Sequence, residues 1–530
     1  MGRNAAGESF IRGFLRWSNQ TTVWVFVQAR EDALAFTKLY GDMCGDRQVD
    51  FVTPENMQKL AEAGCLFYPG PGVDELTSQR QIFGNKLWSV CGITHTTASD
   101  RAMSAIVNML TTPVEPWDAL ICPSNAVKGH AEVMLEEQSS FLAERLGSVK
   151  VTYPEMPVIP LGIHTEDFSY TGDKKRAARS ALGINDEEIV VLYTGRLSFH
   201  AKAHPLAMYQ ALENAVSVSK REVVLIESGW HGNEHIEAAF QEGAKVVCPN
   251  IRVIRLDGRD VIQRNQGWAS ADIFCSLVDN IQETFGIVPI EAMAAGLPVV
   301  VSDWDGYRDS VRDEVDGYRI PTTMPEAGLG QDLAYRHAVG IDSYDRYCGN
   351  TSSLVSVDIE AAAGAFVKLF NSPELRDQMG ASGRKRAKEH YDWEIIIPKY
   401  EELWDRLKNI RQSKPSKNRG PQKHPARLDP FYAFSGYPTR QLSPKTLLGL
   451  RLENAPATLS QLEKVGGLAM VNFAAYVIPT KEEAEIIINN LEAQPKSAEQ
   501  ILEFIPERRR PYVSRSLVWM LKMGLLRELR

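Results

Sequence analysis

The sequence predicts an α/β protein with two facing Rossmann-like domains and a small, mainly helical C-terminal domain. Three observations predict this fold. Short apolar runs rich in β-branched residues alternate with helix-length segments over residues 1–410, as expected for βαβ units that form parallel sheets. A segment with proline and glycine at 158–163 divides this alternation into two halves. A basic, proline-containing stretch at 411–427 then precedes a region that does not continue the alternation.

Each half is expected to contain five strands, and ligands of such sheets bind at the carboxyl ends of the strands. The strands expected in the first half are residues 23–27, 65–68, 88–93, 119–122 and 149–152. Those expected in the second half are residues 189–193, 223–227, 251–256, 272–275 and 299–302. The predicted boundaries are a first domain at 1–160, a second domain at 161–390, an amphipathic helix at 391–410, a linker at 411–427 and a third domain at 428–530. The active site is therefore expected in the cleft between the first two domains.

Composition and charge exclude several classes of protein. The 530 residues carry a net charge of −8, which gives no general reason to expect nucleic-acid binding. The printed sequence has no long apolar run and no basic-then-apolar signal sequence, so neither a membrane span nor secretion is expected. The seven cysteines are scattered, and no two have Cys-x2-Cys spacing. Reduced thiols in a cytoplasmic protein are therefore expected.

The run ETFGIVPIEAMAAGLPVVVSDWDG places two carboxylates, Glu283 and Glu291, around a turn and the start of a helix. Gly286 lets the backbone approach a ligand closely. The first amides of the helix carry the positive end of its dipole. An acid beside those amides can bind sugar hydroxyls, and an acid one to two turns into the helix can bind a ribose. Two acids at this spacing also occur by chance in helical proteins, so the surrounding residues decide the interpretation.

This run resembles the Glu-x7-Glu signature of retaining nucleotide-sugar glycosyltransferases of family 4, which have the GT-B fold. The Phe-Gly between the acids, the string EAMAAGLPVV and the following Ser-Asp carry the resemblance. It covers about residues 1–410 and is strongest over 158–320. The family implies transfer of a hexose from a nucleotide diphosphate sugar to a glycan, lipid or small-molecule acceptor, as in polysaccharide biosynthesis. It further implies retention of configuration, no metal, and no cofactor besides the nucleotide sugar as co-substrate.

Arg196 and Lys202 form the second signal, because they follow a strand that ends in the sequence Tyr-Thr-Gly. Two fixed cations can stabilise the negative charge that develops on a leaving diphosphate. The alternative is a pair of ordinary surface cations. The resemblance implies that both side chains bind the donor diphosphate, together with Gly286 and Ile287.

The resemblance also assigns the remaining contacts to the donor. The residues implied to contact the donor sugar are Glu283, Thr284, Phe285 and Gly286. Glu283 is expected to be catalytic, because it would orient the sugar and stabilise its cationic transition state. Glu291 would bind the ribose. The diphosphate itself is expected to act as the base, so no dedicated nucleophile is required of the protein.

The first half contributes fewer candidates. His95 follows a predicted strand and matches a family histidine at the donor sugar, although a lone histidine is more often structural. Gly7 would let backbone amides approach the donor diphosphate, and the alternative is a plain strand–helix turn. Ser124 follows the strand at 119–122, and we favour a structural role for it as the cap of the next helix.

The N-terminus departs from the family pattern of strand, glycine-rich turn and helix. Gly2 and Gly7 correspond to the turn and residues 10–15 to the helix, but no strand precedes them. Either the start of the sequence is assigned too late, or the sheet lacks its first strand. We favour the late start, because an empty central position in a parallel sheet would leave backbone groups unpaired.

Residues 428–530 have no place in a glycosyltransferase core and end in a segment weakly similar to a winged-helix or helix-turn-helix module. Its basic residues Arg508, Arg510, Arg515 and Lys522 support an alternative function, a regulatory or nucleic-acid-binding protein on a sugar-nucleotide-sensing scaffold. Basic residues are usually only solvated, and such modules more often dock proteins. A protein partner is therefore favoured for 428–530, beside the nucleotide-sugar donor and the glycan or lipid acceptor. Peripheral association with a membrane is left open.

Overall fold

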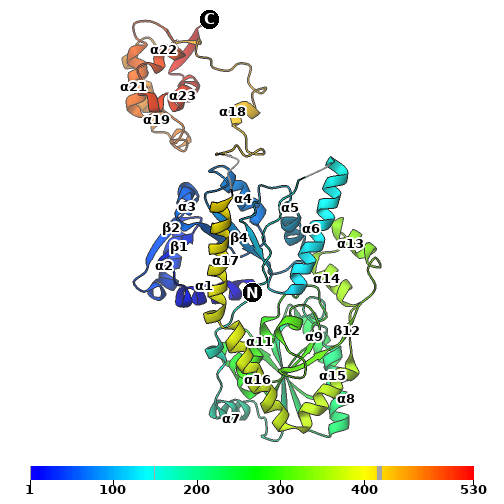
Figure 1. The fold of residues 1–530 in the computed structure, drawn as a ribbon. Helices are drawn as coiled ribbons and strands as arrows, with labels where there is room; N and C mark the ends of the chain where they lie inside the picture. The colour runs from blue at the N-terminus through cyan, green and yellow to red at the C-terminus, as the bar shows by residue number, and fades with distance from the viewer. Residues whose placement is uncertain (1, 148–149, 415–419, 530) are drawn as a thin grey trace. The chain divides into compact units, whose positions relative to one another are not determined.

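The structure is a computed structural model that describes residues 2–147, 150–414 and 420–529. The chain forms two compact units, Met1–His424 and Pro425–Arg530. The first unit contains two α/β halves, and its last helix runs from the second half back along the first (Figure 1). Both halves use parallel strands, so the predicted α/β fold with two Rossmann-like halves is confirmed.

The second half is built on a six-stranded parallel sheet in the order β11-β10-β9-β6-β7-β8. If β6 is numbered as the first strand of this half, the order read from β8 to β11 is 3-2-1-4-5-6, which is that of a doubly wound sheet. The first strand, β6, is therefore a central one. The strands of the sheet are β6 (Ile189–Leu197), β7 (Val223–His231), β8 (Arg252–Asp257), β9 (Ile273–Ser276), β10 (Val299–Ser302) and β11 (Gly317–Ile320). All five strands predicted for this half are confirmed, and the short β11 was not predicted.

The helices of the second half pack in pairs around this sheet, as in α8 with α15 and α11 with α16. The remaining elements of this half are η2 (Thr165–Phe168), α7 (Gly172–Ala181), α8 (Leu206–Ser219), α9 (Glu234–Val247), α10 (Val261–Ser270), α11 (Ile287–Ala295), α12 (Tyr307–Ser310), β12 (Thr322–Thr323), α13 (Gln331–Ala338), α14 (Tyr344–Ser352), β13 (Ser356–Val357), α15 (Ile359–Asn371) and α16 (Pro373–Tyr391). The apolar strand residues lie in one continuous core, because both faces of a parallel sheet are covered by helices.

The first half has the same order of elements but an interrupted sheet. β1 pairs with β2, and β3 pairs with β4, which pairs with β5. No pairing joins β1 to β3 in the described part of the chain. The elements are α1 (Gly2–Trp17), β1 (Thr22–Phe26), α2 (Arg30–Cys44), β2 (Gln48–Val52), η1 (Pro54–Lys59), α3 (Leu60–Ala63), β3 (Cys65–Tyr68), α4 (Val73–Gln81), β4 (Ser89–Ile93), α5 (Asp100–Asn108), β5 (Ala119–Ile121) and α6 (Asn125–Leu146).

Two expectations for the first half are wrong. Residues 150–152 are not a strand, while residue 149 lies outside the described residues. Gly7 is not in a turn, because α1 is helical from Gly2 to Trp17. The other four predicted strands are confirmed, and β2 is an additional one that was not predicted.

The helix α17 (Trp393–Ser413) joins the second half to the first. The side chain of Asp392 caps the start of α17. The helix ends at Ser413, three residues beyond the predicted end at 410. Arg411, which the sequence placed in the linker, is buried and donates to the carbonyl of Gly64 and to Ser89. The burial of Arg411 shows that α17 still contacts the first half in its last turn.

The second unit is a small, mainly helical body with a three-stranded antiparallel sheet in the order β15-β14-β16. Its elements are α18 (Pro430–Ala433), β14 (Leu447–Leu450), α19 (Ala455–Gly466), α20 (Ala469–Asn472), α21 (Lys481–Asn490), β15 (Lys496–Ser497), α22 (Ala498–Leu502), η3 (Glu507–Arg509), α23 (Arg510–Lys522) and β16 (Leu526–Leu529). Side chains of the helices and the sheet form a separate hydrophobic core.

Candidate active site

The predicted donor residues of the second half gather where β6 and β9 end and α11 begins. Arg196 lies at the carboxyl end of β6, and Lys202 follows in the loop before α8. Glu283 lies in the loop between β9 and α11. This is the edge of a parallel sheet at which ligands bind, so the topology brings together residues 87 positions apart in the sequence.

Glu283 and Lys202 form an ion pair inside the protein. The Lys202 ammonium donates to Glu283 Oε2, and their side chains are only 20% and 11% exposed, in that order. Burial by itself would raise the pKa of Glu283, but the Lys202 charge and the amides of Thr284 and Phe285 hold this pKa below its ordinary value. Glu283 is therefore an anion at neutral pH, as a group that stabilises a developing positive charge must be.

Arg196 is held by acceptors from two loops, the one after β6 and the one before α11. Its guanidinium donates to the carbonyl of Ala201, and to Gln282 Oε1 at 2.7 Å. Gln282 directly precedes Glu283, so one loop positions both the arginine and the ion pair. The loop before α11 therefore orients both cations of the predicted diphosphate site, Arg196 through Gln282 and Lys202 through Glu283.

Gly286 is required by the geometry of the turn before α11. It caps the helix with φ +77, a left-handed conformation that favours glycine. A Cβ at this position would lie 1.8 Å from Tyr307 Cε1, so a side chain could not be accommodated without displacing the tyrosine. The backbone at Gly286 and Ile287 remains the part of this turn that can approach a ligand.

Phe285 is the residue of this loop that the structure separates from the site. Its side chain is 2% exposed and lies in the core, with its ring centroid 6.2 Å from that of Tyr391. Only the backbone of Phe285 can take part in donor binding. The side chain instead anchors the loop that carries Glu283.

Glu291 lies on α11, one turn into the helix from Gly286. Burial raises its pKa to about 7, against the opposing effect of the Arg264 charge. Tyr170 lies close enough for the charge of Glu291 to affect its pKa. A partly buried carboxyl group beside a tyrosine hydroxyl is suited to hydrogen bonding with a diol.

The first half reaches the same site through two strand ends. Thr284 Oγ1 donates to the carbonyl of His95 at 3.0 Å, directly after β4. Ser124 caps α6, as predicted, by accepting from Val127 N. It also donates to the carbonyl of Thr284 at 2.7 Å and to Asp305 Oδ1 at 3.1 Å. His95 and Ser124 therefore meet the loop that carries Glu283.

Asp305 is a site residue that the sequence argument missed. It follows β10 with φ 43, which is rare for a residue other than glycine. Burial, and then the nearby charge of Glu283, raise its pKa to about 8. The Asp-Gly pair after the strand at 299–302 signalled a turn in the sequence, but nothing in it placed the carboxyl group beside Glu283.

Gly7 is the predicted site residue with the least support from the geometry. It lies inside α1, where an added Cβ would meet no atom within 4 Å. Its backbone amide lies within a helix, so it is not presented to a diphosphate in the way a glycine-rich turn would present it.

Within the described residues, no three His, Cys, Asp or Glu side chains lie close enough to hold a metal ion.

Comparisons with known proteins agree with this geometry. Residues 174–328 match the family of glycosyl transferases group 1, and this segment contains every donor residue of the second half. A D-inositol 3-phosphate glycosyltransferase of Kribbella flavida is 28% identical over 42% of this chain and 55% of its own. A GDP-mannose-dependent monoacylated alpha-(1-6)-phosphatidylinositol monomannoside mannosyltransferase of Corynebacterium glutamicum is 22% identical over 77% of this chain and 94% of its own.

Among solved structures, the Anabaena protein HepE in complex with UDP is similar with a TM-score of 0.49. The two proteins are 14% identical, and the match covers 76% of this chain and 96% of HepE. The chain spans little more than half of the Kribbella relative, at 55%. Both relatives are named as sugar-transferring enzymes, and the family model matches within the half that contains the ion pair.

Proposed function

We propose that this protein is a retaining glycosyltransferase that moves a sugar from a nucleoside diphosphate to a glycan or lipid acceptor. The observation that carries the proposal is the convergence of Arg196, Lys202 and Glu283 where β6 ends and α11 begins. The two cations at this edge are opposite in charge to a leaving diphosphate, and the anion is opposite in charge to a sugar that becomes positive. The match of residues 174–328 to glycosyl transferases group 1 supports the same reaction.

Arg196 and Lys202 would bind the diphosphate and stabilise its charge as the bond to the sugar breaks. Lys202 already contacts Glu283, so its ammonium can bridge the diphosphate and this carboxylate. Glu283 would orient the sugar through its hydroxyls and stabilise the cationic transition state. The departing diphosphate would take the proton of the acceptor hydroxyl, so the protein need not supply a base.

Glu291 would bind the ribose, and His95 would contact the donor sugar from the first half. The support for His95 is its position beside Thr284, whose hydroxyl donates to the His95 carbonyl. The backbone amides at Gly286 and Ile287 would bind the diphosphate at the positive end of α11. Because the two cations supply positive charge directly, we propose that no metal is needed.

The acceptor is proposed to be a glycan or a lipid headgroup. The relatives' names refer to inositol 3-phosphate and to phosphatidylinositol monomannoside, so these polyols are the first acceptors to test. No helix in the described part of the chain combines the length and the apolar character needed to cross a bilayer. A lipid acceptor would then be reached from the membrane surface.

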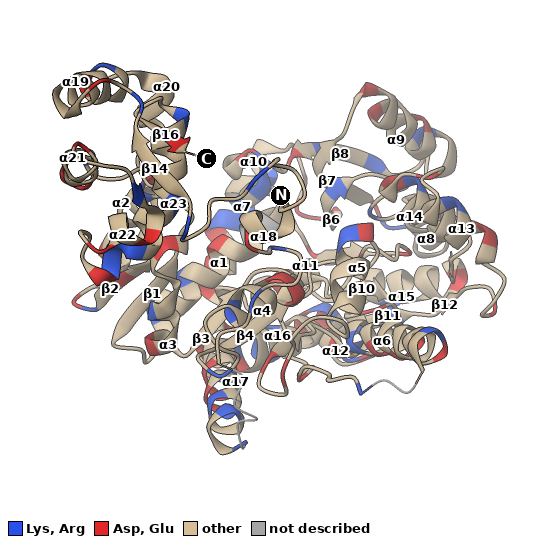
Figure 2. Ribbon diagram, turned by 90° about the horizontal axis from the view of Figure 1, so that it is seen from above, with Lys and Arg blue, Asp and Glu red and all other residues tan. Residues whose placement is uncertain are grey.

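A charge argument disfavours the alternative of a nucleic-acid-binding protein. Figure 2 shows Lys and Arg interspersed with Asp and Glu along the elements of the first unit. In the second unit, Arg509 is paired with Glu483 at 2.7 Å. Binding to a phosphate backbone depends on a surface of one sign, so the α23 region is proposed to contact a protein instead.

Calorimetry with UDP, GDP and ADP in the presence of EDTA tests the donor site. One of the three should bind clearly, and the full chain should then hydrolyse the corresponding nucleotide sugar slowly in a screen of radiolabelled donors. Binding by none of them would exclude the donor site proposed here. Binding that requires a divalent cation would exclude only the metal-independent mechanism.

A further inference from the structure

Residues 324–355 of the second half form an excursion that carries α13 and α14. The strands on either side of it, β12 and β13, pair with each other in antiparallel register, so the chain leaves and returns at one place. The segment that matches glycosyl transferases group 1 ends at residue 328, so both helices lie beyond it. In Figure 1 they lie on the side of the second half that is nearer the first. The excursion is therefore placed to reach the first half.

The two helices of the excursion are tied to each other by polar and aromatic contacts. Asp342 is 3% exposed and accepts hydrogen bonds from Arg336 Nε and Nη2, both at 2.8 Å. It also accepts from Asn350 Nδ2 at 3.2 Å. The rings of His337 and Tyr347 stack, with centroids 4.2 Å apart and planes at 1°. A two-pronged arginine–carboxylate pair fixes orientation as well as distance, so α13 and α14 are held in one arrangement.

Both helices contact the loop between β4 and α5 of the first half. The Tyr344 hydroxyl lies 3.3 Å from Thr96 Oγ1 and forms a hydrogen bond with it. His337 Nε2 lies 3.2 Å from Asp100 Oδ1, at the start of α5. Thr96 directly follows His95 in the sequence. The excursion of the second half therefore holds the loop that carries a proposed site residue of the first.

The same helix α14 packs on the loop that carries Lys202. A Cβ added to Gly349 would lie 3.0 Å from His200 Cβ, so the helix backbone lies directly against this loop between β6 and α8. Arg196 is near enough for its charge to affect the pKa of Tyr344. One helix thus contacts the loop of the donor cations and, through Tyr344, the loop of the first half.

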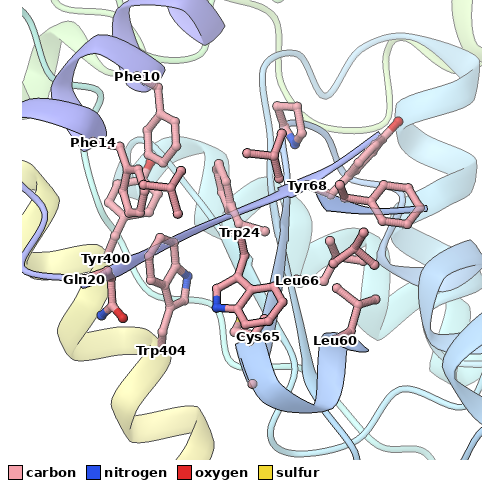
Figure 3. A pocket seen from close by; sticks show the side chains of 18 of the residues that line it. Phe10, Phe14, Gln20, Trp24, Leu60, Cys65, Leu66, Tyr68, Tyr400 and Trp404 are labelled. Carbon is pink, nitrogen blue, oxygen red and sulfur yellow. The ribbon is translucent and has the colours of Figure 1, made fainter. Parts of the chain in front are cut away.

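The loop that carries His95 also borders a cavity. This cavity of about 990 Å³ lies in the first half and includes His95 in its lining. Figure 3 shows aromatic side chains around part of it, among them Phe10, Tyr400 and Trp404. Atoms that face a cavity lack packing partners on that side. The position of the His95 loop therefore depends more strongly on its hydrogen bonds to the second half, through Thr284 and Tyr344.

We propose that α13 and α14 act as a clamp between the two halves, in which the hydrogen bond of Tyr344 to Thr96 holds the His95 loop in place opposite Lys202. Tyr344 would be a positioning residue, since it acts through this loop and not on the sugar or the diphosphate. A misplacement of about 1 Å between reacting groups can lower a rate about 10²-fold. The effect on transfer rests on the proposed transferase function, whereas the clamp itself does not.

Tyr344→Phe tests the clamp, because it removes one hydroxyl and keeps the ring. We expect kcat to fall about three- to tenfold, the effect of one neutral hydrogen bond, with the KM for the nucleotide sugar unchanged. Thr96→Ala should lower kcat in the same way, and Thr96→Ser should recover most of that loss. The control is Tyr335→Phe, which removes a hydroxyl from the same clamp at a residue that is 63% exposed and should leave kcat unchanged.

A double variant tests whether the two hydroxyls act together. If their hydrogen bond carries the effect, Tyr344→Phe combined with Thr96→Ala should lower kcat no further than either single change. Additive losses would overturn the proposal. A rise in KM with kcat unchanged would also overturn it, because Tyr344 would then act in substrate binding.

Hydrogen exchange measures the clamp without any need for activity. In the full chain, Tyr344→Phe should speed the exchange of the backbone amides at 95–99 by roughly threefold or more, and Tyr335→Phe should not. Unchanged exchange at 95–99 would overturn the clamp whether or not the protein transfers a sugar. Faster exchange with a normal kcat would overturn the positioning role of Tyr344. A chain without activity on any nucleotide sugar would contradict the proposed function instead, and exchange would still decide whether the clamp exists.

Discussion

The two α/β halves share a strand order but differ at its centre. In the second half, β6 joins the pair β7 and β8 to the three strands β9, β10 and β11, and it also carries Arg196 to the proposed donor site. In the first half, β1 and β3 face a cavity at the equivalent position. A central parallel strand thus has two roles, since it buries the faces of its neighbours and presents residues at the carboxyl edge. Changes placed in one half at a time separate these roles.

The largest expected effect is on turnover in the second half. Glu283→Gln should lower the rate of transfer by about 10²–10³-fold, because it removes the charge opposite the developing cation. Nucleoside diphosphate affinity should stay the same or increase, since Lys202 is released from its ion pair. Steady-state kinetics and calorimetry on the same preparation would measure both. Normal turnover in the variant would contradict the role given to Glu283.

Two glycine substitutions compare the packing of the halves. Gly286→Ala should destabilise the protein by roughly 1–3 kcal/mol, because it forces a side chain into a left-handed turn against Tyr307. Gly7→Ala should stabilise it by about 0.5–1 kcal/mol, because this glycine lies in a helix with open space around it. Urea denaturation measures both. If Gly7→Ala weakened nucleotide binding, the predicted role of Gly7 at the diphosphate would be supported after all.

Affinity for the nucleotide should depend on the second half alone. Arg196→Ala should weaken nucleoside diphosphate binding about tenfold or more, since a charge-assisted hydrogen bond contributes roughly 1.5–3 kcal/mol. His95→Ala should leave this affinity unchanged and lower only the rate of transfer. Titration calorimetry of the two variants gives the comparison. Equal losses of affinity would show that the first half also binds the nucleotide.

Asp305, at the junction of the two halves, should make the free energy of unfolding depend on pH. Its pKa is raised to about 8, whereas an unfolded aspartate titrates near 3.9. Between about pH 4 and 8 the folded state retains a proton that the unfolded state has lost, so this group lowers the free energy of unfolding as pH rises. Asp305→Asn should flatten that decline. Parallel pH profiles of stability in the two proteins would exclude this contribution.

The smallest effect is expected from removal of the second unit. A chain that ends at Lys414, after α17, should remain folded and bind the nucleotide as the full chain does, because it retains both α/β cores. Circular dichroism and calorimetry would check this. A gel shift of residues 425–530 with duplex DNA at two salt concentrations tests the alternative function, since salt-sensitive binding would favour a nucleic-acid partner.

Much of the second half could be predicted because its signals are local. The strand at Val299–Ser302 and the helix end at Gly296, with φ 80, follow from short β-branched and glycine-proline patterns. The start of α11 at Ile287 is fixed by the left-handed conformation of Gly286, the residue before it. The strand expected at 149–152 was wrong over its described residues, because an apolar run does not specify its pairing partner.

The sequence by itself determined the α/β class and five of the six strands of the second sheet, and it predicted candidate donor residues that the structure brings together beside β6. These depend on the period of apolar residues and on backbone preferences that act over a few positions. Only the tertiary structure decided that Lys202 pairs with Glu283, that Ser124 bonds to Asp305, and that the first sheet is split. Such contacts join residues far apart in the chain, and their formation depends on burial and strand order, which local sequence does not encode.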